Sequence, residues 1–268
     1  MGSSIQRGFS LVELLATLGI VAFLIAAVIP MTNMCLNKAN ETRELAGARR
    51  TIEAWSSYAA DNSGAILPGY KSEPGVVNGR GQALHFPANA RYVFRLAPYL
   101  DFALKGSLLV NKQARLTDDY AISTMPSFGI NLTFVGGDFG SGSDLQPTEQ
   151  NLTAYGKFVV TRLAEIHSPG KLIVFASARF SDPSIGTREG YNAIKSPRLQ
   201  SQRWPAAYDE RRPYYEFGNV HPRFSGRAVC AMADGHVELL SYEQLLDMRR
   251  WSNQAAEAND PDWTLQSL

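Results

Sequence analysis

The chain has 268 residues, of which 45% are apolar, and its 26 Lys and Arg nearly balance its 25 Asp and Glu. Because a dedicated nucleic-acid-binding protein usually carries a clear basic excess, this balance argues against that class. The two cysteines, Cys35 and Cys230, exclude a disulfide-dense secreted scaffold, and there is no CxxC pair to indicate a zinc ribbon or a thioredoxin-type site. The apolar residues are concentrated near the N-terminus, and that block decides the class of protein.

Residues 14–31 form this block, LLATLGIVAFLIAAVIPM, which has no charged residue and only Thr17 as a polar side chain. A helix of about 20 residues crosses a bilayer, so the block is long enough to be an anchor. A cleavable secretory signal has a shorter apolar stretch, which is followed by small residues at its cleavage site. Because Thr32, Asn33 and Met34 follow here, we expect the block to be retained as a membrane-spanning helix.

The most specific motif of the chain precedes and enters this block. Residues 7–15 read RGFSLVELL, a string that closely resembles the processing site of type IV prepilins and type II secretion pseudopilins. The resemblance implies cleavage between Gly8 and Phe9 by a membrane-embedded prepilin peptidase, which then methylates the new N-terminal Phe9. Glu13 occupies the glutamate position of that family, and Pro30 falls where many members have a kink in the helix.

The same resemblance implies the location and the partners of the protein. It implies a single-pass protein of a bacterial inner membrane, with a cytoplasmic N-terminus and its head outside the cytoplasm, that is extracted into a periplasmic or surface filament. The implied partners are the peptidase, other pilin-like subunits, and an inner-membrane assembly platform with its ATPase. No nucleic acid and no cofactor are expected. In such a filament we expect Glu13 to pair with the Phe9 amine of a neighbouring subunit, because either charge alone is costly in an apolar core.

The helix is expected to continue beyond the apolar block, to about residue 60. Its second part has apolar residues at spacings of three and four, which form one stripe: Leu45, Ala48, Ile52, Trp55 and Ala59. Residues 61–64, Asp-Asn-Ser-Gly, are typical of a helix end. A one-sided stripe requires another layer to cover it, which predicts packing against a sheet.

The remainder of the chain favours turns and short elements, because thirteen of the fourteen prolines lie beyond residue 64. Strands are expected at residues 157–163 and 171–177, and in a hairpin at 227–240 that turns at Asp234-Gly235. Ser241 and Gln244 predict a capping box that opens a short helix. The predicted fold is α+β, in which a long N-terminal helix packs on a C-terminal head with an antiparallel β-sheet. The predicted domains are a leader peptide at 1–8, a helix at 9–60 that spans the membrane to about residue 34, and a head at 61–268.

The C-terminal half shows a second, more diffuse resemblance. Residues 127–131, 162–176 and 233–238 resemble the H-X9-DG processing-associated region that follows prepilin-type N-termini in bacterial pseudopilin-like proteins. The histidine departs from that pattern, because the expected position is Phe224, whereas His221 lies three residues earlier. The departure leaves the role of His221 open.

Little in the sequence points to catalysis or to a metal. The four histidines show no HExxH or i, i+4 spacing, and neither a nucleophile elbow nor a P-loop occurs. Adjacent acids such as Asp118-Asp119 are common on solvated surfaces, so no enzymatic activity is expected. Asp138 and Asp144 lie in a glycine-rich loop and are weak candidates for a calcium site, since calcium takes about six to eight oxygen ligands. A plain flexible loop is the favoured interpretation.

Two further features remain open. Cys35 and Cys230 either pair in an oxidising compartment or, as favoured, remain separate thiols. Arg211-Arg212 and Tyr214-Tyr215 either contact a sugar or nucleic acid or are simply solvated. We therefore predict a pilin-like structural subunit of a type II secretion pseudopilus or a type IV pilus-like filament. The alternative is a membrane-anchored surface binding module, an adhesin or polysaccharide binder, that uses the prepilin signal for export.

Overall fold

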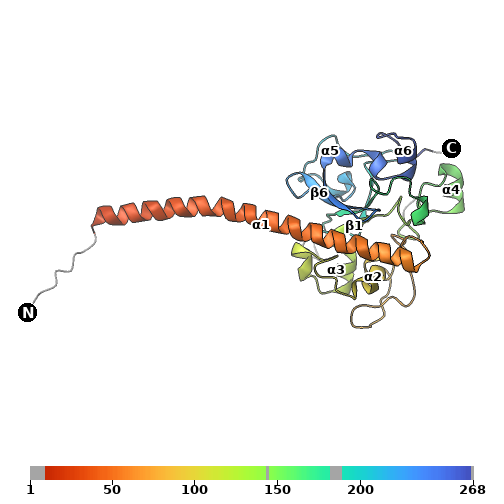
Figure 1. Cartoon of the computed structure of the whole chain (residues 1–268), viewed down its shortest axis with the longest axis horizontal. Coiled ribbons are helices and arrows are strands. Elements are labelled where there is room, and N and C mark those ends of the chain that lie inside the picture. The colour runs from red at the N-terminus through yellow and green to blue at the C-terminus, as the bar shows by residue number, and fades with distance from the viewer. Residues whose placement is uncertain (1–9, 143–144, 182–188, 267–268) are drawn as a thin grey trace, which may run out of the picture. The chain divides into compact units, whose positions relative to one another are not determined.

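The computed structural model describes residues 10–142, 145–181 and 189–266, with the side chains of residues 25 and 27–31 left undescribed. The chain forms two compact units, Met1–Glu41 and Thr42–Leu268. Helix α1 (Leu11–Asp61) runs through both units (Figure 1). Its residues 42–61 therefore belong to the second unit, which we call the head unit, whereas the sequence placed the start of the head at residue 61.

The head unit is built on a sheet whose five described strands have the order β3-β1-β2-β6-β7. The strands are β1 (Phe128–Asn131), β2 (Ile173–Ser177), β3 (Ala193–Ile194), β6 (Arg227–Met232) and β7 (Val237–Ser241). The pairs β1–β2, β2–β6 and β6–β7 are antiparallel, and β1–β3 is parallel. A separate antiparallel pair is formed by β4 (Arg198–Leu199) and β5 (Gln202–Arg203). The predicted α+β class, with a helix packed on a largely antiparallel sheet, is confirmed.

Short helices surround this sheet. The α-helices are α2 (Tyr92–Leu96), α3 (Asp119–Thr124), α4 (Glu149–Tyr155), α5 (Tyr242–Leu245) and α6 (Asn253–Glu257). The 3-10 helices are η1 (Ala97–Leu100), η2 (Asn111–Arg115), η3 (Leu163–Glu165), η4 (Tyr214–Phe217) and η5 (Met248–Arg250). In Figure 1, α2 and α3 lie on one side of the C-terminal part of α1, while α5 and α6 lie on the other side with β6.

Local sequence signals account for several of these elements. The predicted hairpin is present, with Ala231 opposite Val237 and with Gly235 at a φ of 94°, which an L-residue rarely adopts. Ser241 and Gln244 form the predicted capping box at the start of α5. The strand predicted at 157–163 is wrong, because this segment makes only isolated bridges, such as that of Val160 with Val135. Its apolar residues are buried in succession, which a continuous apolar run signals equally well in a strand or in a buried loop.

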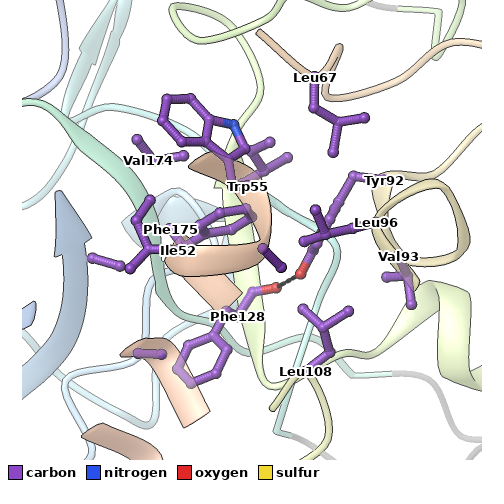
Figure 2. Packing of buried hydrophobic residues seen from close by; sticks show 14 of the residues in the cluster. Ile52, Trp55, Leu67, Tyr92, Val93, Leu96, Leu108, Phe128, Val174 and Phe175 are labelled. Carbon is purple, nitrogen blue, oxygen red and sulfur yellow. Dashed lines mark hydrogen bonds between the residues drawn. The ribbon is translucent and has the colours of Figure 1, made fainter. Parts of the chain in front are cut away.

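The predicted apolar stripe is the central layer of one core. Ala48, Ile52, Trp55 and Ala59 are fully buried. Figure 2 shows Ile52 and Trp55 among side chains of α2, β1 and β2, where the hydroxyl of Tyr92 donates a hydrogen bond of 2.6 Å to the carbonyl of Phe128. The stripe therefore ties residues 42–61 to one face of the sheet.

The opposite face of the sheet packs against the C-terminal helices. Alternate residues of β6 divide between the two cores, since Val229 and Ala231 belong to the core with α1, while Cys230 and Met232 belong to the second core. This second core includes Trp251, which is fully buried. Because both faces are covered, β6 reads as an uninterrupted apolar run instead of an alternating one.

Candidate functional site

The N-terminal motif begins at the edge of the described chain. Gly8 and Phe9, the predicted cleavage pair, lie outside the described residues. Ser10 caps α1, because the Ser10 amide donates to Glu13 Oε2 at 2.9 Å and the Glu13 amide donates to Ser10 Oγ at 3.2 Å. This reciprocal pair is a capping box, which fixes the start of the helix close to the predicted cleavage point. The carboxylate of Glu13 is solvent-exposed.

The first turns of α1 expose large apolar side chains in every direction. Leu11, Val12 and Phe23 are 75%, 73% and 74% exposed. At about 100° per residue, the exposed apolar positions of this segment cover the whole circumference of the helix: Leu11, Val12, Leu14, Leu15, Leu18, Ile20, Val21, Phe23 and Leu24. A helix that is apolar all round requires an apolar environment, either lipid or other helices.

The predicted membrane span is described only in part. Among the described residues, no helix is both long enough and apolar enough to cross a membrane. The side chains of Ile25 and of residues 27–31, including Pro30, belong to the predicted span and lie outside the described residues.

A buried ion pair links the second part of α1 to the sheet. Glu44 is fully buried, and Arg223 donates to both of its carboxylate oxygens, from Nη2 to Oε1 at 2.6 Å and from Nε to Oε2 at 3.0 Å. The hydroxyl of Ser177 donates to Oε1 at 2.5 Å, and the amide of Asn111 donates to Oε2 at 3.3 Å. Buried charges are tolerated when they are paired and fully hydrogen-bonded. The bidentate contact with Arg223, together with the bonds from Ser177 and Asn111, meets that requirement.

Sequence reasoning did not identify this cluster. Glu44 lies four residues before Ala48 and therefore falls on the buried stripe of α1, a signal that it needed an internal partner. The partner lies 179 residues further along the chain, and no local pattern reveals a pairing over that separation.

His221 lies next to this cluster and is buried, being 6% exposed. Arg223 Nη1 lies 3.1 Å from His221 Nδ1. Because burial disfavours the imidazolium and the nearby guanidinium of Arg223 repels it, the pKa of His221 falls from 6.5 to about 2. The imidazole is therefore neutral at physiological pH. Its Nδ1 accepts from Arg223, and the proton resides on Nε2.

The other candidate residues take structural positions. His236 Nδ1 lies 2.6 Å from Asp234 Oδ1 within the hairpin turn, while His85 and His167 are exposed. Within the described residues, no group of three or more His, Cys, Asp and Glu side chains is arranged to hold a metal ion. Asp118 caps α3 by accepting from the Ala121 amide at 2.9 Å.

The glycine-rich loop holds Asp138 internally. Asp138 is buried, and its carboxylate accepts from the amides of Gly140 and Ser141 and from the Ser141 hydroxyl. Asp144 lies outside the described residues. Calcium binding by this loop stays a prediction.

Both cysteines are free thiols. Cys35 is exposed and lies in the first unit, and Cys230 is fully buried in β6. Burial raises the pKa of the Cys230 thiol, so this residue is an inert core side chain. In this structure the two cysteines are separate thiols.

Comparison with known proteins places the specific signal at the N-terminus. Residues 3–29 match the model of the prokaryotic N-terminal methylation motif. No curated protein and no solved structure matches the chain. The matched motif is a prepilin-type signal, which implies processing by a prepilin peptidase and inner-membrane anchoring before that processing.

Proposed function

We propose that the chain is a pilin-like structural subunit, cleaved between Gly8 and Phe9 and assembled through α1 into a type II secretion pseudopilus or a type IV pilus-like filament. The observation that carries this proposal is the methylation motif at 3–29, which runs directly into a helix with apolar side chains exposed around its whole circumference. Such a surface packs favourably first against lipid and then against the same helices of neighbouring subunits. At about 25 cal/mol per Å² of apolar area, the packing of many such helices is a large driving force.

Glu13 has a distinct role in this assembly. After cleavage, the α-amine of Phe9 would have a pKa near 8 and would carry a charge at neutral pH. In a filament core, that charge and the Glu13 carboxylate of a neighbouring subunit neutralise one another, whereas each alone would cost several kcal/mol. Glu13 therefore sets the axial register between subunits, as polar groups in apolar helical interfaces are known to do.

The partners follow from the same proposal. A prepilin peptidase removes the leader and methylates Phe9, while an inner-membrane platform and its ATPase move the subunit out of the bilayer. Other pilin-like subunits supply the neighbouring helices. The head unit then lies on the outside of the filament, in the periplasm or at the cell surface.

The processing step is tested by intact-mass analysis of the protein from the membrane fraction of cells with and without the peptidase. Loss of Met1–Gly8 together with the gain of one methyl group is expected only in cells that contain the peptidase. An unprocessed N-terminus in both strains would contradict the proposal.

The assembly step is tested with Glu13→Ala and a matched control, Glu53→Ala, which removes an exposed carboxylate further along the same helix. We expect both variants to be cleaved and methylated, and only Glu13→Ala to be lost from sheared filaments. If Glu13→Ala assembles as well as Glu53→Ala does, Glu13 has no role in register. A processed, anchored wild type that never enters a filament would instead favour the alternative of a surface binding module.

A further inference from the structure

A cleft of about 430 Å³ opens in the head unit, beside the loop that carries Arg211 and Arg212. Its volume lies in the range of pockets that hold small ligands. The described lining comes from five places in the chain: η2, the segment just after β2, Glu189 ahead of β3, residues 210–214 and the segment after η4. The residues are Lys112, Arg179, Phe180, Ser181, Glu189, Glu210, Arg211, Arg212, Pro213, Tyr214 and His221.

The lining of the cleft contains a buried hydrogen-bond donor, the Nε2–H group of His221. Since Nδ1 of His221 accepts from Arg223, Nε2 carries the proton, as described above. This Nε2 lies 3.7 Å from Oε1 of Glu210, which is beyond hydrogen-bond range. The Glu210 side chain is 75% exposed and therefore free to move. The Nε2–H group of His221 is thus able to donate a hydrogen bond to an acceptor atom of a bound ligand.

Arg179 fixes the 210–214 loop, which forms another part of the cleft lining. This residue is 7% exposed, and its guanidinium donates to the carbonyls of Glu210 and Arg212 at 3.0 and 2.5 Å and to the Tyr208 hydroxyl at 3.1 Å. Because Arg179 holds the backbone on both sides of residue 211, it is a positioning residue for the two exposed arginines. The cleft is therefore built by a buried side chain, whereas a chance gathering of surface lysines and arginines has no such support.

The chemistry of the lining is cationic and partly aromatic. The described lining carries four cationic side chains, from Lys112, Arg179, Arg211 and Arg212. Lys112 pairs with Glu189, Arg211 with Asp209 and Arg212 with Glu216, while Arg179 bonds the loop carbonyls. The pairs of Arg211 and Arg212 are partly exposed, so a ligand anion competes for these two guanidinium groups with carboxylates that water already screens. Phe180 and Tyr214 belong to the same lining, with ring centroids 4.8 Å apart. Guanidinium groups match carboxylates in geometry, and aromatic rings offer an apolar surface to the C–H face of a sugar.

We propose that this cleft binds an acidic saccharide, a sugar that carries a carboxylate. In this proposal Arg211 and Arg212 contact the carboxylate of the sugar, and Phe180 and Tyr214 contact the sugar ring. The Nε2–H of His221 donates a hydrogen bond to a substituent of the sugar ring or to the same carboxylate. Glu210 weakens the binding of the ligand, because its negative carboxylate lies in the region that the anion enters and repels it. This site is independent of the filament proposal, since no residue of the N-terminal motif takes part.

The experiment is isothermal titration calorimetry on the full chain in micelles of a polyoxyethylene detergent, which has no sugar headgroup. The probes are digalacturonate, its neutral methyl ester and inorganic phosphate. We expect digalacturonate to bind at least about tenfold more tightly than either of the others, because the ester lacks the charge and phosphate lacks the ring. No binding of digalacturonate, or equal binding of the ester, overturns the proposal. Equal binding of phosphate also overturns it, in favour of a simple anion site.

Variants test the geometry with exposed residues, so that folding is preserved. The double variant Arg211→Ala/Arg212→Ala is expected to weaken digalacturonate binding at least about tenfold, and Glu210→Gln to strengthen it about threefold or more. The matched control is Arg80→Ala, which removes an exposed arginine outside the lining of the cleft and is expected to change nothing. An unchanged affinity in the double variant, or a weaker one in Glu210→Gln, contradicts the assignment. Circular dichroism of each variant confirms that the fold is retained.

Discussion

The buried pair of Glu44 and Arg223 gives a sharp prediction about how the head unit is held together. In Glu44→Ala, the guanidinium of Arg223, whose side chain is 10% exposed, loses two hydrogen bonds and its counter-charge. Ser177 loses an acceptor in the same step. Removing one member of a buried ion pair costs about 3–5 kcal/mol, because the remaining charge stays buried. We expect Glu44→Ala to lower the free energy of unfolding by this amount.

The assay is urea unfolding of the full chain in non-ionic micelles, followed by tryptophan fluorescence. With a slope of about 3 kcal/mol per M of urea, the midpoint should fall by about 1–1.7 M. Glu53→Ala, at an exposed position of the same helix, should shift it by less than about 0.2 M. The double variant Glu44→Leu/Arg223→Met should recover most of the loss, because apolar replacement of both partners leaves no stranded charge. A loss below about 1 kcal/mol in Glu44→Ala would refute the assignment of a buried, mutually dependent pair.

Two further predictions concern stability. Gly136 has a φ of +72°, and a Cβ there would lie 2.1 Å from the Leu67 carbonyl oxygen. Gly142 shares a positive φ, but a Cβ there would meet open space, so Gly142→Ala should lower the free energy of unfolding by about 1–2 kcal/mol in the same assay. Gly136→Ala should lower it clearly more, because the steric clash adds to the backbone strain. Because the pKa of His221 is about 2 in the folded chain and 6.5 in the unfolded chain, the unfolded chain binds the proton first as the pH falls. The neutral His221 therefore contributes fully to the free energy of unfolding above pH 6.5. About 2 kcal/mol of this contribution is lost as the pH falls from 7 to 5. His221→Asn should remove this part of the pH dependence, and an unchanged slope in the variant would contradict the low pKa.

The sequence predicted those parts of the fold that depend on local chemistry. The apolar stripe of α1, the turn at Asp234-Gly235 and the capping box at Ser241 each follow from residues that lie within a few positions of one another. The short parallel strand β3 could not be predicted, because its two residues are defined only by their pairing with β1. The segment 157–163 was misassigned for a related reason, since apolar residues buried in succession do not distinguish a strand from a covered loop.

The two candidate sites also differ in whether their residues are close together in the sequence. The processing motif is contiguous and could be identified from its residues alone, and the comparison at residues 3–29 agrees with that prediction. The cleft beside Arg211 gathers Lys112, Arg179, Glu189 and His221 from segments far apart in the chain. Sequence reasoning singled out Arg211-Arg212 and His221 separately, and only the fold brings them into one cleft.

The two carboxylates that matter most on α1 differ in where their charge is balanced. Glu44 meets its cation inside the head unit, with Arg223, Ser177 and Asn111 satisfying both oxygens, so it requires nothing from another chain. The described contacts of Glu13 are with Ser10, whose hydrogen bonds cap a helix end but bring no positive charge. An exposed carboxylate tolerates this in water, but the apolar side chains around Glu13 predict that it is transferred out of water. A cation must then come from elsewhere, and in the proposed filament it is the α-amine that cleavage creates at Phe9 of a neighbouring subunit. In the proposed filament, processing and assembly would thereby be coupled, since a chain that keeps its leader has no charged amine at Phe9.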